Sequence, residues 1–348
     1  MPKTGVLVVN LGTPDSPSTA DVRKYLFQFL NDPRVIDIHP IARMLLVNLI
    51  IVPFRAPKSA KIYKELWEHY KPNGSPLLYY GKYIEKELQN QLGSDYKVLL
   101  GMRYQNPPIE PAIDVLLKSG IEKLIVLPLF PQYASASTGS VMEEVMRILS
   151  KYQTLPEVSI ISNYFDNELF IKAFSTLTQK HLNESNYDHI LFSYHGLPER
   201  QIRKGDKTKT CLTNGGSCCD TLHEHNRFCY RAQCFATTRL IAKELNLSEN
   251  QYSSCFQSRL GRDPWIKPYT DDVIKQLAKE GKKRILALVP SFVSDCLETT
   301  IEVGEEYKEI FLESGGEHWQ MVESLNDNHM WIDCLKNLVL EKNGSMLN

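Results

Sequence analysis

Five of the chain's eight cysteines lie within 24 residues, with the spacing C-x6-CC-x9-C-x4-C: Cys211, Cys218, Cys219, Cys229 and Cys234. Thiolates hold zinc ions or iron–sulfur clusters, and in a reducing compartment clustered cysteines more often bind metal or do redox chemistry than form disulfides. Because two adjacent cysteines rarely ligate one site together, four ligands are the natural count. The spacing predicts either a [2Fe–2S] cluster or a zinc site; scattered free thiols are the alternative.

A histidine, His195, follows the apolar run HILFSY and precedes Gly196 and Pro198. Ligands of open α/β sheets bind at the carboxyl ends of the strands, where this side chain would lie. A neutral imidazole there can accept a proton or hold a metal near physiological pH. A hydrogen-bonded structural histidine is the alternative, and position alone does not separate the two.

Four carboxylates, Asp295, Glu298, Glu302 and Glu306, follow a second apolar run at steps of 3, 4 and 4. On an α-helix at about 100° per residue they fall within an arc of about 80°. Such a row of oxygen ligands can carry protons or a divalent cation between solvent and a site. The alternative is a solvated helix face whose acids are stabilised near the N-terminus by the macrodipole.

Apolar strand-like runs alternate with amphipathic stretches along the whole chain, which predicts parallel sheets covered by helices. The alternation occurs twice, with a break near residue 155. We therefore expect two Rossmann-like α/β lobes, 1–155 and 156–348, with an active-site cleft between them and a C-terminal helix. Strands are expected at 5–12, 96–104, 123–131, 158–165, from 189, at 252–258 and within 270–295, and a helix at 296–314.

The composition is that of a soluble globular protein, with 43% hydrophobic and 23% charged residues among 348 and a net charge of −1. A nucleic-acid-binding protein would normally show a basic excess, so no nucleic-acid partner is expected. The N-terminal residues lack the pattern of a signal peptide, and the apolar run 41–54 is shorter than a membrane span. We expect a cytoplasmic protein, a monomer or a homodimer.

Taken together, these stretches resemble the ferrochelatase family, whose members insert ferrous iron into a porphyrin as the last step of haem biosynthesis. The likeness covers nearly the whole chain in the family's order, through VNLGTPDSP, FLNDPRVI, GSPL, GMRYQNP, LPLFPQYASASTGS, SYHGLPERQIRKGD, FQSRLGRDPWIKPYTD and LVPSFVSDCLET. It implies a chelatase-like fold, lyase activity, and protoporphyrin IX and Fe²⁺ as substrates. A non-catalytic tetrapyrrole or metal carrier, or an iron–sulfur sensor, on the same fold is the alternative.

The resemblance also implies roles for individual residues. His195 matches the catalytic histidine and Glu298 its acidic partner, both at the substrate iron, while Glu302 and Glu306 match the family's acidic path. Residues that line the porphyrin site in the family correspond to Leu11, Arg103, Tyr104, Ser135 and Trp265. Family members that use coproporphyrin tend to have tyrosine at the position of Leu11, so this leucine favours protoporphyrin IX.

Two departures from the family pattern concern cysteines. Cys296 stands where many members have a histidine, so a proton relay here must work without that imidazole. About 20 extra residues, 207–228, resemble the internal insertion with which some bacterial members hold a [2Fe–2S] cluster. The resemblance implies Cys211, Cys218 or Cys219, Cys229 and Cys234 as ligands. A C-terminal cysteine group is absent, because only Cys334 lies there.

The apolar run 41–54, followed by Arg55, Lys58 and Lys61, resembles the family's apolar active-site lip. It is expected to rest on the inner face of a membrane that supplies the porphyrin. A helix buried in the core is the alternative, because Arg43 and Asn48 fit either environment.

Overall fold

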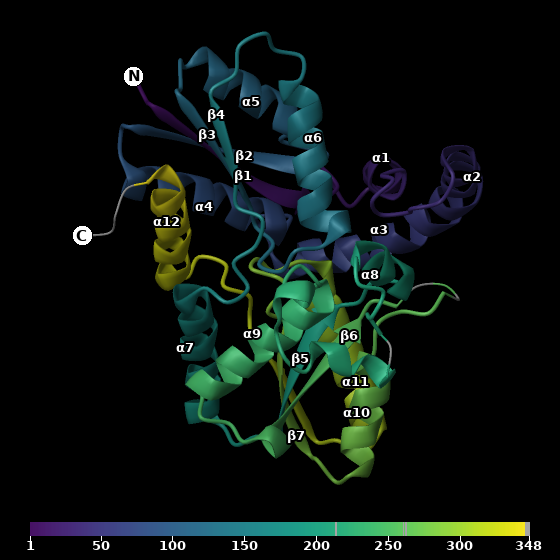
Figure 1. Cartoon of the computed structure of the whole chain (residues 1–348). Coiled ribbons are helices and arrows are strands. Elements are labelled where there is room, and N and C mark those ends of the chain that lie inside the picture. Colours follow the sequence, from purple (N-terminus) through teal and green to yellow (C-terminus); the bar gives the residue numbers. More distant parts are fainter. Residues whose placement is uncertain (213, 260, 262, 345–348) are drawn as a thin grey trace. The chain divides into compact units, whose positions relative to one another are not determined.

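The computed structural model describes residues 1–212, 214–259, 261 and 263–344, with the side chains of 214–216 excepted. The chain forms two units, each with its own parallel sheet (Figure 1). The first unit comprises Met1–Phe130, Ala134–Asn163 and the segment from Trp331, and the second comprises Pro131–Tyr133 and Tyr164–Met330.

The first unit is built on four parallel strands in the order β2-β1-β3-β4, which are β1 (Thr4–Gly12), β2 (Tyr96–Tyr104), β3 (Lys123–Pro128) and β4 (Glu157–Ile160). The central strand β1 is almost continuously apolar because helices cover both faces of such a sheet. Its helices are α1 (Thr19–Leu30), α2 (Pro40–Leu45), α3 (Val52–His69), α4 (Pro76–Leu92), α5 (Ile109–Lys118), α6 (Ser140–Leu149) and α12 (His329–Asn343).

The second unit repeats this plan with the order β6-β5-β7-β8, where the strands are β5 (His189–His195), β6 (Tyr252–Gln257), β7 (Arg284–Leu288) and β8 (His318–Met321). Its helices are α7 (Glu168–Glu184), α8 (Glu199–Gly205), α9 (Tyr230–Glu244), α10 (Thr270–Lys279) and α11 (Tyr307–Glu313). Short 3₁₀ turns lie at η3 (Asn214–Cys219), η4 (Glu224–Asn226) and η5 (Glu249–Gln251).

The prediction of two Rossmann-like lobes with helix-covered parallel sheets is confirmed. The cleft between them stays a prediction, since each unit is described by itself. β3 and β4 end at Pro128 and Ile160, short of the predicted 131 and 165. β8, only four residues long, carried no clear alternation and was missed in the sequence.

The α-helical geometry expected for the acidic row is wrong. Residues Leu297–Glu306 form a π-helical segment, η6, and the α-helix α11 begins only at Tyr307. Two further π-helical segments, η1 (Leu46–Ile51) and η2 (Ser135–Gly139), lie in the first unit. π-helical turns occur frequently at functional sites, because the extra residue re-aims the side chains around it.

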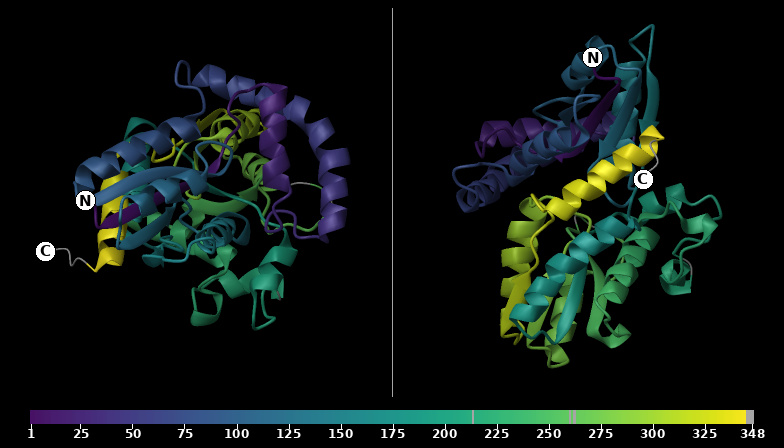
Figure 2. Two further views of the ribbon diagram at one scale, coloured as in Figure 1. Left: turned by 90° about the horizontal axis from the view of Figure 1, so that it is seen from above. Right: turned by 90° about the vertical axis from the view of Figure 1, so that its left-hand side faces the viewer.

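A long helical run, α2–η1–α3 over Pro40–His69, packs beside α1 in the first unit (Figure 2). By length and composition alone it is apolar enough to cross a membrane. Only 17% of its most apolar stretch of 18 residues is buried inside the protein. The exposed apolar side chains are Ile41, Met44, Leu45, Leu49, Ile50 and Phe54. The alternative of a helix buried in the core is therefore wrong for this segment.

Candidate active site

The backbone at His195 is held on both sides where β5 ends. The carbonyl of His195 accepts a hydrogen bond from the Tyr230 hydroxyl at 2.9 Å, and the N–H of Gly196 donates to the Gln257 carbonyl at 2.8 Å. A Cβ added at Gly196 would lie 2.8 Å from that same carbonyl oxygen. Only glycine fits this close approach, so the His195–Gly196 peptide has one orientation.

The imidazole of His195 has a defined tautomer. Its Nδ1 lies 2.6 Å from the carbonyl oxygen of Gly196, which can only accept a hydrogen bond. In the neutral imidazole Nδ1 therefore carries the proton, which leaves the lone pair on Nε2 for a proton or a metal. The rings of Trp265 and Phe292 both lie near the imidazole, each with its centroid 6.4 Å from that of the His195 ring.

Gln257 connects His195 to the acidic segment. It pairs with His195 in the parallel register of β6 with β5, and its side chain is almost fully buried. The side-chain oxygen accepts from the Ser193 hydroxyl at 2.7 Å, and the side-chain nitrogen donates to the Glu298 carbonyl at 2.8 Å. His195 and Glu298 are thus placed at the same edge of the second sheet.

Glu302 is held by donors from three residues. One carboxylate oxygen accepts from the Ser258 hydroxyl at 2.6 Å and the Gln257 amide at 3.1 Å, and the other accepts from the Tyr307 hydroxyl at 2.9 Å. Burial, together with the Glu302 carboxylate, raises the pKa of Tyr307, so this hydroxyl stays protonated and donates. Glu298 and Glu302 are half-buried and Glu306 is exposed, so the row of carboxylates leads outward.

Asp295 does not share this outward row. Its carboxylate is buried and accepts from the Thr299 hydroxyl at 3.0 Å, the Asn326 amide at 2.7 Å and the Ser324 N–H at 3.2 Å. It therefore fixes the start of η6 to the loop after β8. Next to it, burial raises the pKa of the Cys296 thiol and the Glu298 carboxylate adds to the effect, so this thiol is neutral.

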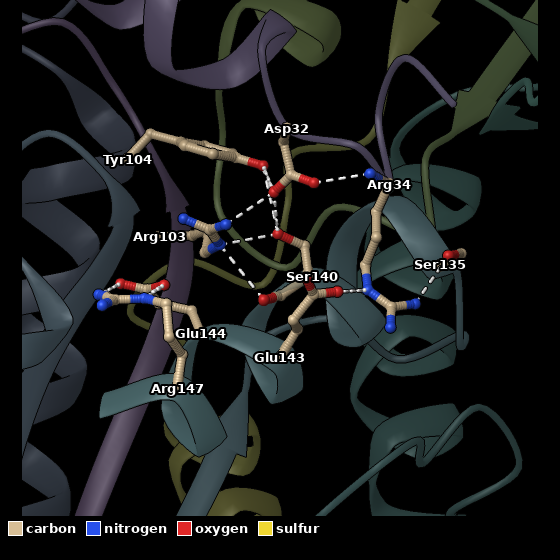
Figure 3. A network of polar contacts seen from close by, with 9 residues as sticks. All are labelled: Asp32, Arg34, Arg103, Tyr104, Ser135, Ser140, Glu143, Glu144 and Arg147. Atoms are coloured by element: carbon tan, nitrogen blue, oxygen red, sulfur yellow. Dashed lines mark hydrogen bonds and ion pairs between the residues drawn. The ribbon is translucent and has the colours of Figure 1, made fainter. Parts of the chain in front are cut away.

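A second polar cluster surrounds Asp32 in the first unit (Figure 3). The buried Asp32 carboxylate pairs with the Arg103 guanidinium at 2.7 Å and accepts from the Tyr104 hydroxyl at 2.8 Å and the Ser140 hydroxyl at 2.6 Å. Burial first, and then the Asp32 charge, raises the pKa of Tyr104. Tyr104 is 2% exposed, so its ring packs in the core of the first unit, and the Arg103 guanidinium lies over this ring, 4.7 Å from its centroid.

Arg34 extends from the same cluster toward η2. Its N–H donates to Asp32 at 2.7 Å, and its guanidinium pairs with Glu143 and donates to the Ser135 hydroxyl at 3.1 Å. Figure 3 shows Arg34 and Ser135 pointing toward one another. Leu11, at the end of β1, is half-buried and packs against the α1–α3 core.

The five cysteines between Cys211 and Cys234 lie in the second unit. The Sγ atoms of Cys218 and Cys219 are 3.8 Å apart. Burial, and then Asp206, raises the pKa of Cys211 to about 11, whereas the neighbouring Cys229 thiol lowers it. Among the described residues, no three Cys, His, Asp or Glu side chains are disposed to hold a metal ion.

Cys219 and Cys234 are the most deeply buried of these thiols. The Cys229 thiol and burial both raise the pKa of Cys219, and the Arg231 guanidinium acts in the opposite direction. Burial raises the pKa of Cys234, and the Cys219 charge adds to it. The Cys211, Cys219 and Cys234 thiols are therefore protonated near neutral pH, and any metal they bind must displace those protons.

Three residues that matter for this geometry were not singled out in the sequence, namely Asp32, Gln257 and Tyr230. Asp32 and Gln257 lie inside quoted stretches, FLNDPRVI and FQSRLGRDPWIKPYTD, where a polar residue beside apolar ones was the only signal. Tyr230 follows Cys229 directly and had no signal of its own. Their partners are distant in sequence, so only packing reveals them.

Solved chelatase structures share this architecture. SirB from Bacillus subtilis with Fe³⁺ is 12% identical, with a TM-score of 0.52 over 97% of this chain and 95% of that one. The sirohydrochlorin chelatase SirB from Bacillus subtilis subspecies spizizenii in complex with cobalt gives a TM-score of 0.51 at 11% identity. At such low identity these matches define the fold, which is that of the two-lobed α/β chelatases.

Sequence comparisons are more specific. The chain is 45% identical to Ferrochelatase from Coxiella burnetii (strain CbuK_Q154) over 96% of this chain and 92% of that protein. It is 42% identical to Ferrochelatase from Legionella pneumophila (strain Lens) over 98% and 99%. The Ferrochelatase family model matches residues 3–343, and the chain belongs to the ferrochelatase family.

Proposed function

We propose that this chain inserts Fe²⁺ into protoporphyrin IX, with His195 as the proton acceptor and Glu298 as its acidic partner. Metal insertion into a porphyrin, a lyase reaction, follows from the family, and neither the family nor the named relatives support a carrier or a sensor. The observation that carries the residue assignment is the His195 tautomer, in which Nε2 keeps its lone pair.

The reaction releases two pyrrole protons as one Fe²⁺ enters the ring, so a base and an outward path for protons are needed. His195 Nε2 takes the two pyrrole protons one after the other at the strand end, and each passes along the row Glu298, Glu302, Glu306 toward solvent. Binding energy from the edges of the macrocycle is spent on bending it, which exposes the nitrogen lone pairs. No electron is transferred, because the iron stays ferrous.

The test mixes the protein with protoporphyrin IX and anaerobic Fe²⁺ and follows the loss of porphyrin fluorescence over many turnovers. His195→Ala should abolish turnover and leave porphyrin binding intact. His329→Ala, which changes an exposed histidine of the second unit outside the cysteine-bearing segment, is the matched control and should keep full turnover. Substantial turnover by His195→Ala would rule out the assigned role.

The porphyrin specificity is assigned to Leu11, which presents an aliphatic side chain at the end of β1. Its neighbours in the α1–α3 core are apolar, including Phe29, which suits a macrocycle without extra carboxylates. We expect higher kcat/KM with protoporphyrin IX than with coproporphyrin. Leu11→Tyr should reduce the difference between the two kcat/KM values. A higher kcat/KM with coproporphyrin than with protoporphyrin IX in the parent would overturn this assignment.

The cysteines are proposed to hold a [2Fe–2S] cluster through Cys211, Cys218 or Cys219, Cys229 and Cys234. The Cys229 thiol shifts the pKa of both Cys211 and Cys219. This favours Cys219 over Cys218 as the ligand from the adjacent pair. The buried guanidinium of Arg231 beside Cys219 supplies positive charge that an anionic cluster requires. A bound cluster would add a redox centre with visible absorbance, which the insertion reaction does not need.

The purified protein, prepared anaerobically, should be red-brown. Cys229→Ser should bleach this absorbance and lower the melting temperature, whereas Cys334→Ala, which changes a cysteine of α12, should keep the colour. A colourless protein that contains stoichiometric zinc would replace the cluster with a zinc site. Colour that persists after all four ligands are removed would exclude these cysteines.

The exposed apolar residues of α2–η1–α3 are proposed to rest on the inner face of the cytoplasmic membrane, with Lys58 and Lys61 near anionic headgroups. The protein would then be cytoplasmic and peripheral. It should float with vesicles that contain anionic lipid, and Leu49→Ser with Phe54→Ser should remove this binding. Leu155→Ser, at an exposed leucine outside the run, is the control.

A further inference from the structure

Tyr230 joins the cysteine-bearing segment to the base. It is the residue directly after Cys229 and the first residue of α9, and it is 6% exposed. Its hydroxyl donates to the backbone carbonyl of His195 at 2.9 Å. The N–H of Gly196, which belongs to the same peptide, donates to the Gln257 carbonyl. The peptide is therefore held by two hydrogen bonds, one of which comes from Tyr230.

The segment Cys218–Cys229 is in turn tied to the start of α9. The buried Asn226 donates through its side-chain nitrogen to the carbonyls of Cys218 and Thr221, at 2.7 and 2.8 Å, and its side-chain oxygen accepts from the His223 N–H. The Asn226 carbonyl accepts from the Cys229 N–H at 2.8 Å. A change in the segment therefore reaches Tyr230 through one short, continuous set of hydrogen bonds.

We propose that Tyr230 is a positioning residue that couples the conformation of Cys218–Cys229 to the His195–Gly196 peptide, and so sets the rate of metal insertion. The inference rests on the proposed role of His195 but does not require a bound cluster. When the segment is ordered, the hydroxyl holds the peptide whose next carbonyl fixes the imidazole tautomer. When the segment loosens, that hydrogen bond weakens and the imidazole Nε2 is no longer held in one orientation.

The first test removes only the hydroxyl, in Tyr230→Phe. The variant loses the donor to the His195 carbonyl and also the contacts of the hydroxyl with Ser291 and Cys234. This should lower kcat roughly three- to tenfold with little change in KM for the porphyrin. The matched control is Tyr194→Phe, since this tyrosine is also buried and lies on β5 directly before His195, and its hydroxyl meets Thr238 of α9 at 2.8 Å rather than the His195 carbonyl. The control should keep kcat within about twofold.

A second readout is independent of turnover. His195–Gly196 is the only His-Gly step in the sequence, so ¹³C-carbonyl histidine with ¹⁵N-glycine gives a single correlation peak for this peptide. Tyr230→Phe should shift this peak, because the carbonyl loses its donor. Tyr194→Phe should leave it nearly in place.

Coupling is tested with Asn226→Ala, which loosens the segment without altering a thiol. It should lower kcat and shift the same peak in the parent, yet add little in a Tyr230→Phe background. Additive effects, or an unmoved peak in Asn226→Ala, would overturn the coupling. If Asn226→Ala does not fold, Asn226→Ser provides a hydroxyl that can donate only one hydrogen bond in place of two, and the same peak and kcat decide.

These outcomes are separable from those of the proposed function. If His195→Ala keeps turnover, the assigned base is wrong, whereas the carbonyl peak still reports whether the segment and the peptide are linked. If Cys229→Ser bleaches the cluster and leaves both kcat and the peak unchanged, the cluster stands and the coupling falls.

Discussion

The side-chain amide of Gln257 donates to the backbone carbonyl of Glu298 at 2.8 Å. Gln257 occupies the register position directly opposite His195, so one buried side chain joins the strand that carries the base to the π-helical segment that carries the acid. The same amide nitrogen reaches Glu302 at 3.1 Å. The position of His195 relative to Glu298 thus depends on Gln257, which is neither the base nor the acid.

Gln257→Met keeps the length of this side chain and removes its donor and acceptor. The Glu298 carbonyl then loses this donor, and the Ser193 hydroxyl loses its acceptor but keeps its contact with the Thr270 hydroxyl at 3.1 Å. A buried polar group that loses its partner costs about 1–3 kcal/mol. We expect kcat to fall at least tenfold while the porphyrin Kd, measured by fluorescence quenching, stays within about twofold. Gln276→Met, at an exposed glutamine of α10, is the control, and equal losses in both variants would contradict this role.

Gly196→Ala should damage the site through a steric effect. The new methyl group would lie 2.8 Å from the Gln257 carbonyl oxygen and 3.1 Å from the Trp265 ring, so the backbone must shift. Overpacking of this kind costs about 1–3 kcal/mol, and the shift moves the imidazole, so turnover should be nearly lost. Gly205→Ala, where nothing lies within 4 Å of the added carbon, should be neutral in both thermal melting and turnover.

Asp32→Ala should destabilise the first unit strongly. It leaves the Arg103 guanidinium, which is 18% exposed, without its carboxylate and removes the acceptor of two buried hydroxyls. Breaking a buried pair in this way costs about 3–5 kcal/mol. The exposed pair of Arg147 with Glu144 offers the comparison, because Arg147→Ala should cost less than about 1 kcal/mol. Urea unfolding measures both, and similar costs would show that the Asp32 cluster is not a strong determinant of stability.

The lowered pKa of His189 predicts that the stability of the protein depends on pH. Burial, together with the Lys282 charge, lowers the pKa of His189 from 6.5 to about 4. Between these two pH values the unfolded chain binds a proton that the folded chain does not. The free energy of unfolding should therefore fall as the pH drops through this window, by about 3 kcal/mol in all from this residue.

The contribution of His189 can be isolated with His189→Gln, which keeps a polar partner for the Ser253 hydroxyl and cannot titrate. Urea unfolding between pH 7 and pH 4 should show a shallower decline for the variant than for the parent. Parallel pH profiles would mean that His189 does not remain neutral in the folded state.

The amino-acid sequence by itself determined the features that depend on neighbouring residues. Apolar runs such as TGVLVVNLG and HILFSYH specify buried strands, and the amphipathic stretches between them specify covering helices, so the two parallel sheets were predictable. The position of His195 followed as well, because a strand end is a local property. The density of cysteines between Cys211 and Cys234 needed only counting.

Only the tertiary structure decided which distant side chains meet. Ser193 and Gln257 are 64 residues apart, and Asp32 and Tyr104 are 72 apart, so no local pattern links them. The π-helical form of Leu297–Glu306 was also invisible, because the spacing of its carboxylates fits an α-helix equally well. Hydrogen bonds of this kind form when packing excludes water around them, and packing is a property of the whole fold rather than of any one segment.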